Sequence, residues 1–531
     1  MPTLEWIGKD RVVNHHQEVP YRVLERQYSY DEAGQHAEDN GSENMIIHGD
    51  NLEALKALLP RYEGKVKCIY IDPPYNTGNE GWVYNDNVND PKIKKWLGEV
   101  VGKEGEDLSR HDKWLCMMYP RLKLLQRLLH PTDGSIFISI DENEFSNLKL
   151  ICNEIFGGNH HVATIAWQKR YSRENRGAIG DAHEYILVYA SDVEVFKTIR
   201  HRVEFDENSA KVYKNPNDDP KGRWRAVPMT AQGYRPNQMY PITTPSGKVC
   251  YPPQGRCWST VESEYKKLLA AGRIYFGKKG DSQPSIIRYL SEVEGMVPWT
   301  WWPHDEVGHT DEAKKEIITV LGDADSFDTP KPTRLIKRIL QIATDPNDLV
   351  LDSFAGSGTT AHAVLNMNKA DGGNRKFILV EMMDYADSIT AERVKRVIDG
   401  YGEGKKAVEG TGGNFSYYEL GPVLLLPDGN LNEEVGAQKI REYVYYMETK
   451  EPLPAEQPTD EPYFMGLCRN TAYYLYYERE RVTTLDHTFL ATIQTKAEGY
   501  TIYADLCAIP QETLRRNNIT FKKIPRDIAR L

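Results

Sequence analysis

The chain has 531 residues with 40% hydrophobic and 27% charged content, which is typical of a globular protein of roughly two to four domains. No apolar run reaches the roughly 20 residues that cross a bilayer, and seven cysteines without a C-x-x-C pair predict reduced thiols in a cytoplasm and no metal site. The net charge of -11 argues against a protein that only coats nucleic acid, but leaves open an enzyme with local basic clusters.

Residues 1–44 carry few apolar positions and are predicted to form an N-terminal arm. Residues 45–190 then alternate short apolar runs with amphipathic runs, as the first half of an α/β domain does. The expected strands are 45–48, 66–71, 135–140, 162–167 and 184–189, and the expected helices are 52–59, 114–129 and 141–156. The polar stretch 76–112 predicts a mobile loop that closes on a substrate.

A distinctive turn follows the strand Val66–Ile71, namely Asp72-Pro73-Pro74-Tyr75. Two prolines cannot continue a sheet ladder, so the strand must end there, at the edge where ligands bind in open α/β sheets. Asp72 and the Pro73 carbonyl can each accept a hydrogen bond from an amino group and so direct its lone pair at an electrophile, and Tyr75 can stack on a base. In isolation, the four residues also fit a plain turn with a surface tyrosine.

Residues 191–325 are rich in Pro, Gly, Tyr and Trp with weak periodicity, which predicts an inserted domain of short strands and loops. Residues 326–400 return to the α/β pattern. There we expect helices over 334–343 and 387–399 and strands over 349–351 and 377–380. A glycine-rich linker, 401–415, leads to a separate C-terminal domain, 416–531, whose tyrosine-rich segments are expected to be buried.

A second motif joins the strand 349–351 to a helix. It is Asp352-Ser353-Phe354-Ala355-Gly356-Ser357-Gly358-Thr359-Thr360. Its glycines allow a close backbone approach to a ligand, and a helix N-terminus can hold a carboxylate or phosphate. The motif does not favour a P-loop, because it has no G-K-[ST] and no lysine follows to reach phosphates, and the dinucleotide pattern fits poorly because only Gly356 and Gly358 are present. Glu381 ends the next strand, where it could accept hydrogen bonds from ribose hydroxyls.

Together the two motifs resemble those of DNA amino-methyltransferases that use S-adenosyl-L-methionine. The D-P-P-Y motif precedes the F-x-G-x-G motif, an order that resembles the beta class. The wider context resembles the modification subunit of Type III restriction-modification systems. The matching stretches are I-D-P-P-Y-N-T-G at 71–78, D-G-S-I-F-I-S-I-D at 133–141, E-I-F-G at 154–157, H-E-Y-I-L-V-Y-A at 183–190 and T-P-K-P-x-R-L-I at 329–336.

This resemblance implies a fold and a domain plan. The fold would be an α/β, Rossmann-like methyltransferase fold with a mixed, mostly parallel seven-stranded sheet, circularly permuted. Residues 45–190 would be the catalytic half and 326–400 the cofactor-binding half of the methyltransferase core. The insertion, 191–325, would be the target-recognition domain, and 416–531 an accessory domain outside the resemblance.

The resemblance also implies roles for single residues. Asp72, Pro73, Pro74 and Tyr75 would hold the target base. Asp50 would hold the adenine amino group of the cofactor and Glu381 its ribose, while Lys331 and Pro332 would close over its methionine end. The methionine part would lie on the glycine turn, on Asp352, Phe354, Ala355, Gly356, Ser357, Gly358 and Thr359. Asp50 is equally compatible with a helix N-cap and Lys331 with a surface charge.

The implied reaction is methyl transfer to the N6 amino group of a flipped-out adenine in double-stranded DNA, in a restriction-modification or phage-defence system. Cytosine N4 is the near alternative, although relatives of that specificity more often carry Ser in place of Asp72. A methyltransferase that acts on RNA or on a protein glutamine also fits the motifs, and so does an inactive DNA-recognition subunit. The expected partners are DNA, a separate helicase-nuclease subunit and a second copy of the chain.

Overall fold

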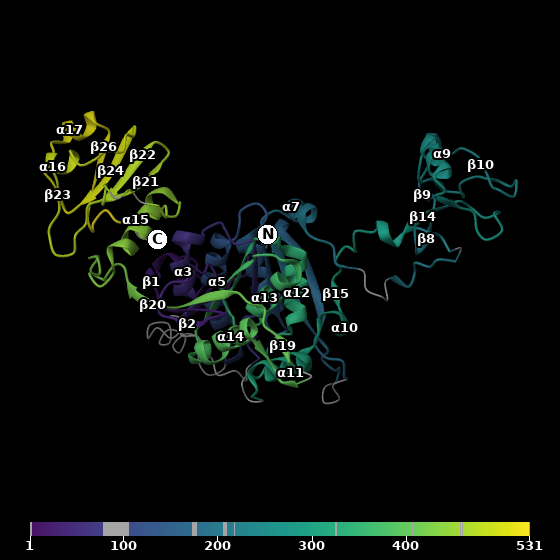
Figure 1. The fold of residues 1–531 in the computed structure, drawn as a ribbon, viewed down its shortest axis with the longest axis horizontal. Helices are drawn as coiled ribbons and strands as arrows, with labels where there is room; N and C mark the ends of the chain where they lie inside the picture. The colour runs from purple at the N-terminus through teal and green to yellow at the C-terminus, as the bar shows by residue number, and fades with distance from the viewer. Residues whose placement is uncertain are drawn as a thin grey trace. The chain divides into compact units, whose positions relative to one another are not determined.

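The structure is a computed structural model that describes residues 3–77, 106–172, 178–204, 210–216, 218–323, 327–404, 407–456, 458 and 460–529. It divides into two compact units, one made of residues 1–200 with 299–531 and the other of residues 201–298 (Figure 1). Within these described ranges, no helix combines the length and the apolar character that a membrane span requires.

A large sheet forms the centre of the first unit and contains eleven strands among the described residues. The seven strands that the sequence predicts are contiguous in it. In spatial order they are β6 (His161–Gln168), β7 (His183–Ala190), β5 (Ser135–Ile140), β4 (Cys68–Ile71), β16 (Leu349–Asp352), β17 (Lys376–Glu381) and β3 (Met45–His48). β7 runs antiparallel to both neighbours, and β5, β4, β16, β17 and β3 are mutually parallel. The predicted mixed, mostly parallel α/β sheet is confirmed.

Four strands extend the sheet beyond the predicted seven. β15 (Trp301–Trp302) pairs with β6 at one edge, and β20 (Asn414–Val423), β1 (Arg22–Asp31) and β2 (Gly34–His36) follow β3 at the other. Residues 1–44 are therefore more than an arm, because 22–36 supply two strands. The predicted C-terminal domain likewise contributes most of β20 to the central sheet. The sequence did not reveal β1 and β20, because polar side chains interrupt the apolar positions of these partly buried strands.

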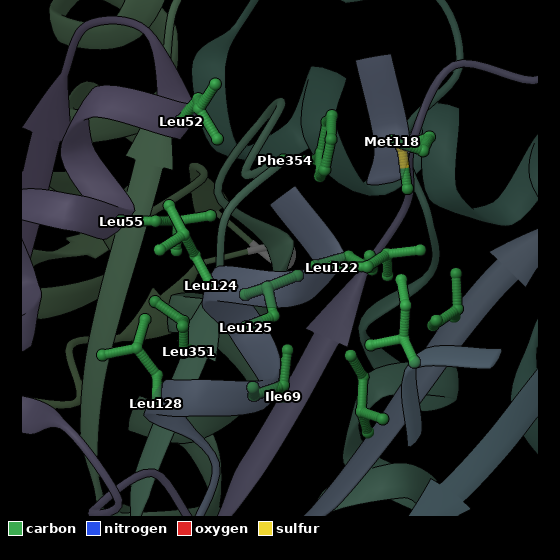
Figure 2. Close-up of a cluster of buried hydrophobic side chains, with 14 of the residues drawn as sticks. Leu52, Leu55, Ile69, Met118, Leu122, Leu124, Leu125, Leu128, Leu351 and Phe354 are labelled. Carbon is green, nitrogen blue, oxygen red and sulfur yellow. The ribbon is translucent and has the colours of Figure 1, made fainter. Parts of the chain in front are cut away.

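Helices cover both faces of this sheet. α3 (Asn51–Tyr62) packs against α5 (Glu106–Leu128), and α12 (Thr333–Ala343) packs against α13 (Thr359–Asp371), which in turn contacts α14 (Glu392–Asp399). Figure 2 shows leucines of α3 and α5 lying together with Ile69 of β4 and Leu351 of β16. Each fully buried leucine contributes roughly 1.5–3 kcal/mol, so this apolar layer fixes the strand ends on which the site depends.

Several element boundaries differ from those predicted. Pro60 lies inside α3, which continues to Tyr62. The helix expected over 141–156 is α6 (Phe145–Cys152) followed by a π-helical turn, Asn153–Gly157. Residues 78–105 of the predicted loop 76–112 lie outside the described residues, and from Glu106 onward the chain is already α5.

The second unit is smaller than the predicted insertion of 191–325. α7 (Val193–Ile199), α10 (His304–Val307) and α11 (Thr310–Leu321) belong to the first unit, where Ala313, Ile317 and Val320 form the buried face of α11. Within residues 201–204, 210–216 and 218–298, the structure describes the short strands that were predicted and, in addition, an α-helix. These are β8 (Trp224–Pro228), β9 (Thr230–Gln232), β10 (Ile242–Thr243), β11 (Val249–Cys250), β12 (Arg256–Trp258), α9 (Glu262–Ala270), β13 (Ile274–Tyr275) and β14 (Ser285–Tyr289).

After β20 the chain forms α15 (Ala437–Thr449) and a further four-stranded sheet. In spatial order its strands are β21 (Phe464–Cys468), β22 (Thr471–Leu475), β24 (Gly499–Ala504) and β26 (Ile519–Lys523). The predicted tyrosine-rich segments lie in α15 and at β22, where Tyr443, Tyr445, Tyr446 and Tyr474 are buried. α15 packs against α3, and Glu442 pairs with Arg61 at 2.9 Å.

Candidate active site

One cavity of about 450 Å³ lies at the carboxyl ends of the parallel strands. β4 and β16 are hydrogen-bonded neighbours, so the turn that follows each of them opens at the same edge. The predicted site residues that line the cavity are Asp72, Pro73, Pro74, Tyr75, Lys331, Asp352, Phe354, Ala355, Gly356, Ser357, Thr359 and Glu381. The fold therefore brings together two motifs that are almost 280 positions apart in the sequence.

The turn after β4 is held from both sides. The Trp114 indole N–H donates to the Pro74 carbonyl at 2.6 Å. Asn76 adopts a left-handed backbone conformation with φ 58°, and its buried side-chain amide donates to Glu144. Glu144 also accepts from Asn147 at 2.8 Å and contacts His111 Nδ1 at 2.6 Å. These contacts fix where Asp72 and Tyr75 project.

Both carboxylate oxygens of Asp72 are engaged by side chains of the chain itself. The Tyr75 hydroxyl lies 2.8 Å from Oδ1, and the Lys331 ammonium lies 2.6 Å from Oδ2. The Lys331 ammonium also lies 5.0 Å from the centre of the Tyr75 ring, within range of a cation–π interaction. Burial, reinforced by the charge of Asp72, raises the pKa of Tyr75 well above its usual value, so the hydroxyl remains a donor.

A second carboxylate, Glu184 of β7, lies next to this group. Its Oε2 is 3.0 Å from the Tyr75 hydroxyl and 3.8 Å from the Lys331 ammonium, and its Oε1 is 3.3 Å from the Lys169 ammonium. Although burial opposes it, the charges of Asp72 and Glu184 raise the pKa of Lys331. Sequence analysis assigned no role to Glu184. The available signal was a carboxylate in the otherwise apolar strand of H-E-Y-I-L-V-Y-A.

The turn after β16 is built differently, from buried groups and backbone amides. The Phe354 amide donates to Asp352 Oδ1 at 3.0 Å, and the Thr360 hydroxyl donates to Oδ2 at 2.5 Å. Burial raises the pKa of Asp352 to about 7. Gly358 has φ +78°, and a Cβ there would lie 3.0 Å from the Thr390 carbonyl oxygen, so this position requires glycine.

Glu381, at the end of β17, joins the glycine turn to the next strand. Its Oε2 accepts from the Gly356 amide at 2.7 Å and its Oε1 from the Met383 amide at 3.0 Å. Burial raises the pKa of Glu381 despite these hydrogen bonds. Phe327 lies beside Gly356, and its ring meets the Tyr385 ring edge-on at 5.6 Å. Phe327 and Tyr385 also line the cavity, and their aromatic character was the only signal in the sequence.

The hydroxyls of Ser357 and Thr359 are held by an arginine that sequence analysis missed. Arg393 Nη1 donates to the Ser357 hydroxyl at 2.9 Å and to the Thr359 hydroxyl at 2.8 Å. The Arg393 side chain is fully buried and pairs with Glu316 of α11 at 3.3 Å. The Arg393 guanidinium of α14 therefore positions the start of α13, and no local sequence pattern predicts this contact.

Three predicted residues are not among the described residues that line the cavity. Asp50 caps α3 by accepting from the Leu52 amide at 2.8 Å, and it pairs with Arg121 at 3.2 Å. Pro332 is buried and precedes α12. Gly358, in the left-handed conformation, is the N-cap of α13. A role for Asp50 or Pro332 at the cofactor stays a prediction.

Comparisons with known proteins find a matching family model and several relatives. A family model described as DNA methylase matches residues 66–392. The StyLTI Mod subunit, a Type III restriction-modification enzyme of Salmonella typhimurium, is 38% identical over 429 residues, which cover 74% of this chain and 62% of that subunit. The Type II methyltransferase M1.MboII of Moraxella bovis is 67% identical over 309 residues, covering 57% of this chain and 82% of the relative.

The chain spans a little under two thirds of the length of the Type III relatives that it matches. Among solved structures, the PvuII DNA methyltransferase, described as cytosine-N4-specific, covers 66% of this chain and 86% of its own at 13% identity and a TM-score of 0.35.

Proposed function

This chain belongs to the DNA methylase family, and from that premise we propose that it transfers a methyl group from S-adenosyl-L-methionine to the N6 amino group of adenine in double-stranded DNA. The observation that carries the proposal is the single cavity that both motifs line. Asp72 and the Pro73 carbonyl offer two acceptors on one side of it, and the glycine turn with Glu381 forms the other.

The residues present fit the cofactor. A cavity of about 450 Å³ falls within the roughly 300–1,000 Å³ that small-molecule sites occupy. Two buried carboxylates, Asp352 and Glu381, suit an ammonium and a pair of ribose hydroxyls, and Gly356, which lines the cavity in a left-handed conformation, allows close backbone approach. The aromatic rings of Phe327 and Tyr385 offer an apolar wall beside the turn. S-adenosyl-L-methionine, when bound, supplies an electrophilic methyl group on sulfur.

In the proposed mechanism the chain positions the nucleophile. The target amino group is paired and stacked inside the duplex, so the base must leave it before Asp72 can reach the amine. Asp72 and the Pro73 carbonyl accept its two N–H groups, which directs the nitrogen lone pair away from both and toward the methyl group. Tyr75 packs on the base. Positioning and electrostatic stabilisation account for the rate acceleration, and no covalent enzyme intermediate is required.

We propose that residues 201–298 read the DNA sequence. The whole chain is acidic, yet this unit has more Lys and Arg than Asp and Glu, as a phosphate-binding surface needs. Exposed basic side chains include Arg223, Arg225, Arg235, Lys278 and Lys279. Arginine and lysine can contact both phosphates and guanine edges.

The names of the relatives support a biological setting. We propose a restriction-modification role of Type III, with a separate helicase-nuclease subunit as partner, and a second copy of the chain as a further partner. The C-terminal residues after β20 are the region that we propose binds one of these partners. We place the protein in the cytoplasm, because all seven cysteines are free thiols.

Single-molecule sequencing of DNA from a methylation-free host tests the function. We expect N6-methyladenine at one short recurring sequence in cells that express this chain, and none in cells that express Asp72→Ala. N4-methylcytosine at such a sequence would replace adenine with cytosine as the target. Unmodified DNA from a strain whose purified protein binds DNA but takes up no cofactor would favour an inactive recognition subunit.

A further inference from the structure

The acceptor that the proposed reaction needs is shared with two other donors. Asp72 Oδ2 carries the Lys331 ammonium at 2.6 Å and Oδ1 the Tyr75 hydroxyl at 2.8 Å. A target amino group that donates to Asp72 must compete with one or both of them. An ammonium is the stronger competitor, because a charge-assisted hydrogen bond is roughly twice as strong as a neutral one.

Glu184 is placed to receive both donors. Its Oε2 lies 3.0 Å from the Tyr75 hydroxyl oxygen and 3.8 Å from the Lys331 nitrogen, so the hydroxyl needs only to rotate and the ammonium to move by about 1 Å. The Lys331 backbone is held meanwhile, because the Thr359 hydroxyl donates to its carbonyl at 3.2 Å. The side chain alone can therefore exchange one carboxylate for the other.

The surroundings of Glu184 indicate a purpose beyond packing. Glu184 is 9% exposed and belongs to a strand whose next six residues, Tyr185–Ala190, are apolar. A buried carboxylate costs several kcal/mol unless it is paired, and here Lys169 is a partner at 3.3 Å on the other oxygen. Lys169 also forms an ion pair at 2.7 Å with Asp181, whose side chain is 39% exposed. Oε2 thus remains directed at the Asp72 group.

We propose that Glu184 is a positioning residue that takes the Lys331 ammonium and the Tyr75 hydroxyl from Asp72 as the target amino group binds. This inference rests on the proposed methyl transfer. Asp72 becomes a stronger acceptor once the ammonium has left it, at the moment when the attacking nitrogen must lose a proton. The N–CH₃ bond forms as the S–CH₃ bond breaks, and the released proton leaves through Asp72.

A double-mutant cycle on the full chain tests the proposal, using Glu184→Gln, Lys331→Met and the pair. Without its charge, residue 184 no longer attracts the ammonium, which stays on Asp72. We expect Glu184→Gln to lower the single-turnover methylation rate at saturating cofactor by roughly 10–100-fold, as loss of a group acting in the transition state does. Binding of S-adenosylhomocysteine should change by less than about twofold, because the glycine turn is untouched.

The decisive comparison is between the effect of Glu184→Gln in the wild-type chain and its effect in the Lys331→Met variant. If Glu184 acts through Lys331, then Glu184→Gln has little further effect once Lys331→Met is present, and the double variant is faster than Glu184→Gln alone. Multiplicative losses would overturn the proposal, because they mean that the two residues act independently. Asp181→Asn is the matched control. It removes a carboxylate that pairs with Lys169 and contacts neither Asp72 nor Tyr75, and we expect a change below about threefold.

The design also covers two other results, namely a Glu184→Gln variant that does not fold and one that keeps full activity. If Glu184→Gln does not fold, Glu184→Asp keeps the charge but withdraws it by one methylene, and its loss must also vanish in the Lys331→Met background. Full activity of Glu184→Gln would overturn the proposal while leaving the function intact. A wild-type chain that binds cofactor and DNA but never methylates would contradict the proposed function itself, before any variant is compared.

Discussion

The turns that follow β4 and β16 occupy equivalent places on adjacent parallel strands, yet they are built for opposite tasks. Each begins with an aspartate at the strand's carboxyl end. Asp72 remains partly exposed, with 24% of its side chain accessible, and its partners are the side-chain ends of Tyr75 and Lys331. Asp352 is buried, and its partners are the Phe354 amide and a threonine hydroxyl of the helix that follows.

The difference separates chemistry from binding. Side-chain donors can rotate or swing away, so Asp72 can change partners during a reaction. Backbone amides and a helix start cannot move without distorting the fold, so the β16 turn is a rigid ligand cradle. Damage to the first turn should therefore reduce turnover with intact cofactor binding, and damage to the second should reduce cofactor binding first.

Asp72→Ala should have the largest effect. It removes a carboxylate acceptor for the target amine, and we expect the single-turnover rate to fall by more than roughly 1,000-fold, as for loss of a key electrostatic group. Cofactor affinity, measured by isothermal titration, should stay within about threefold of the wild-type value. Parallel losses of cofactor affinity and rate would mean that Asp72 belongs to the cradle.

Two variants of Tyr75 separate the contribution of the ring from that of the hydroxyl. Tyr75→Ala removes the stacking surface, and since base–aromatic stacking contributes roughly 1–3 kcal/mol, we expect a loss of about 10–100-fold in kcat/KM. Tyr75→Phe keeps the ring and should lose less than about fivefold. Steady-state kinetics on a duplex with one target site distinguishes the two. Equal damage from both variants would assign the role to the hydroxyl instead.

The sequence was most informative where apolar periodicity and turn chemistry coincide. The seven central strands, the D-P-P-Y turn and the glycine turn were all predicted in place, because buried parallel strands are continuous apolar runs and Pro and Gly mark their ends. To predict that the two turns lie side by side requires the order of the strands in the sheet, and only the resemblance to a family supplied that order.

What the sequence could not give lies in contacts between distant segments. Glu184, Arg393 and Asn76 each act through a partner at least 34 positions away, and no local pattern encodes such a pairing. β1 and β20 were missed for a related reason. Each is only partly buried, so its pattern lacks the apolar continuity of the central strands.

Two glycines at opposite ends of α13 test the cradle with a matched pair. Gly358 and Gly372 have φ values of +78° and +71°, so alanine costs each roughly 1–2 kcal/mol of backbone strain. Only at Gly358 does the new Cβ also crowd the Thr390 carbonyl oxygen, at 3.0 Å, whereas Gly372 faces open space. We expect Gly358→Ala to weaken cofactor binding by about 10–30-fold and Gly372→Ala by less than about twofold, although both lower the melting temperature. Equal weakening would attribute the effect to general destabilisation.

The raised pKa of Asp352 predicts a pH dependence of stability and of cofactor affinity, which is the smallest but most specific of the expected effects. The carboxyl has a pKa of about 7 in the fold, against roughly 4 in an unfolded chain. The folded chain therefore binds more protons than the unfolded chain between these two values, and the stability that the neutral carboxyl contributes is lost as the pH rises through 7.

Cofactor binding should respond in the opposite direction, because only the ionised Asp352 carboxylate can pair with an ammonium. From pH 6 to pH 8 the ionised fraction grows by about tenfold, so affinity for S-adenosylhomocysteine should rise by up to that factor. Asp352→Asn cannot ionise, so its weaker affinity should lack this component, while any titration of the ligand itself affects both proteins alike. Isothermal titration at several pH values measures both slopes. Identical slopes would remove Asp352 from the ammonium site and leave the cradle to the backbone amides alone.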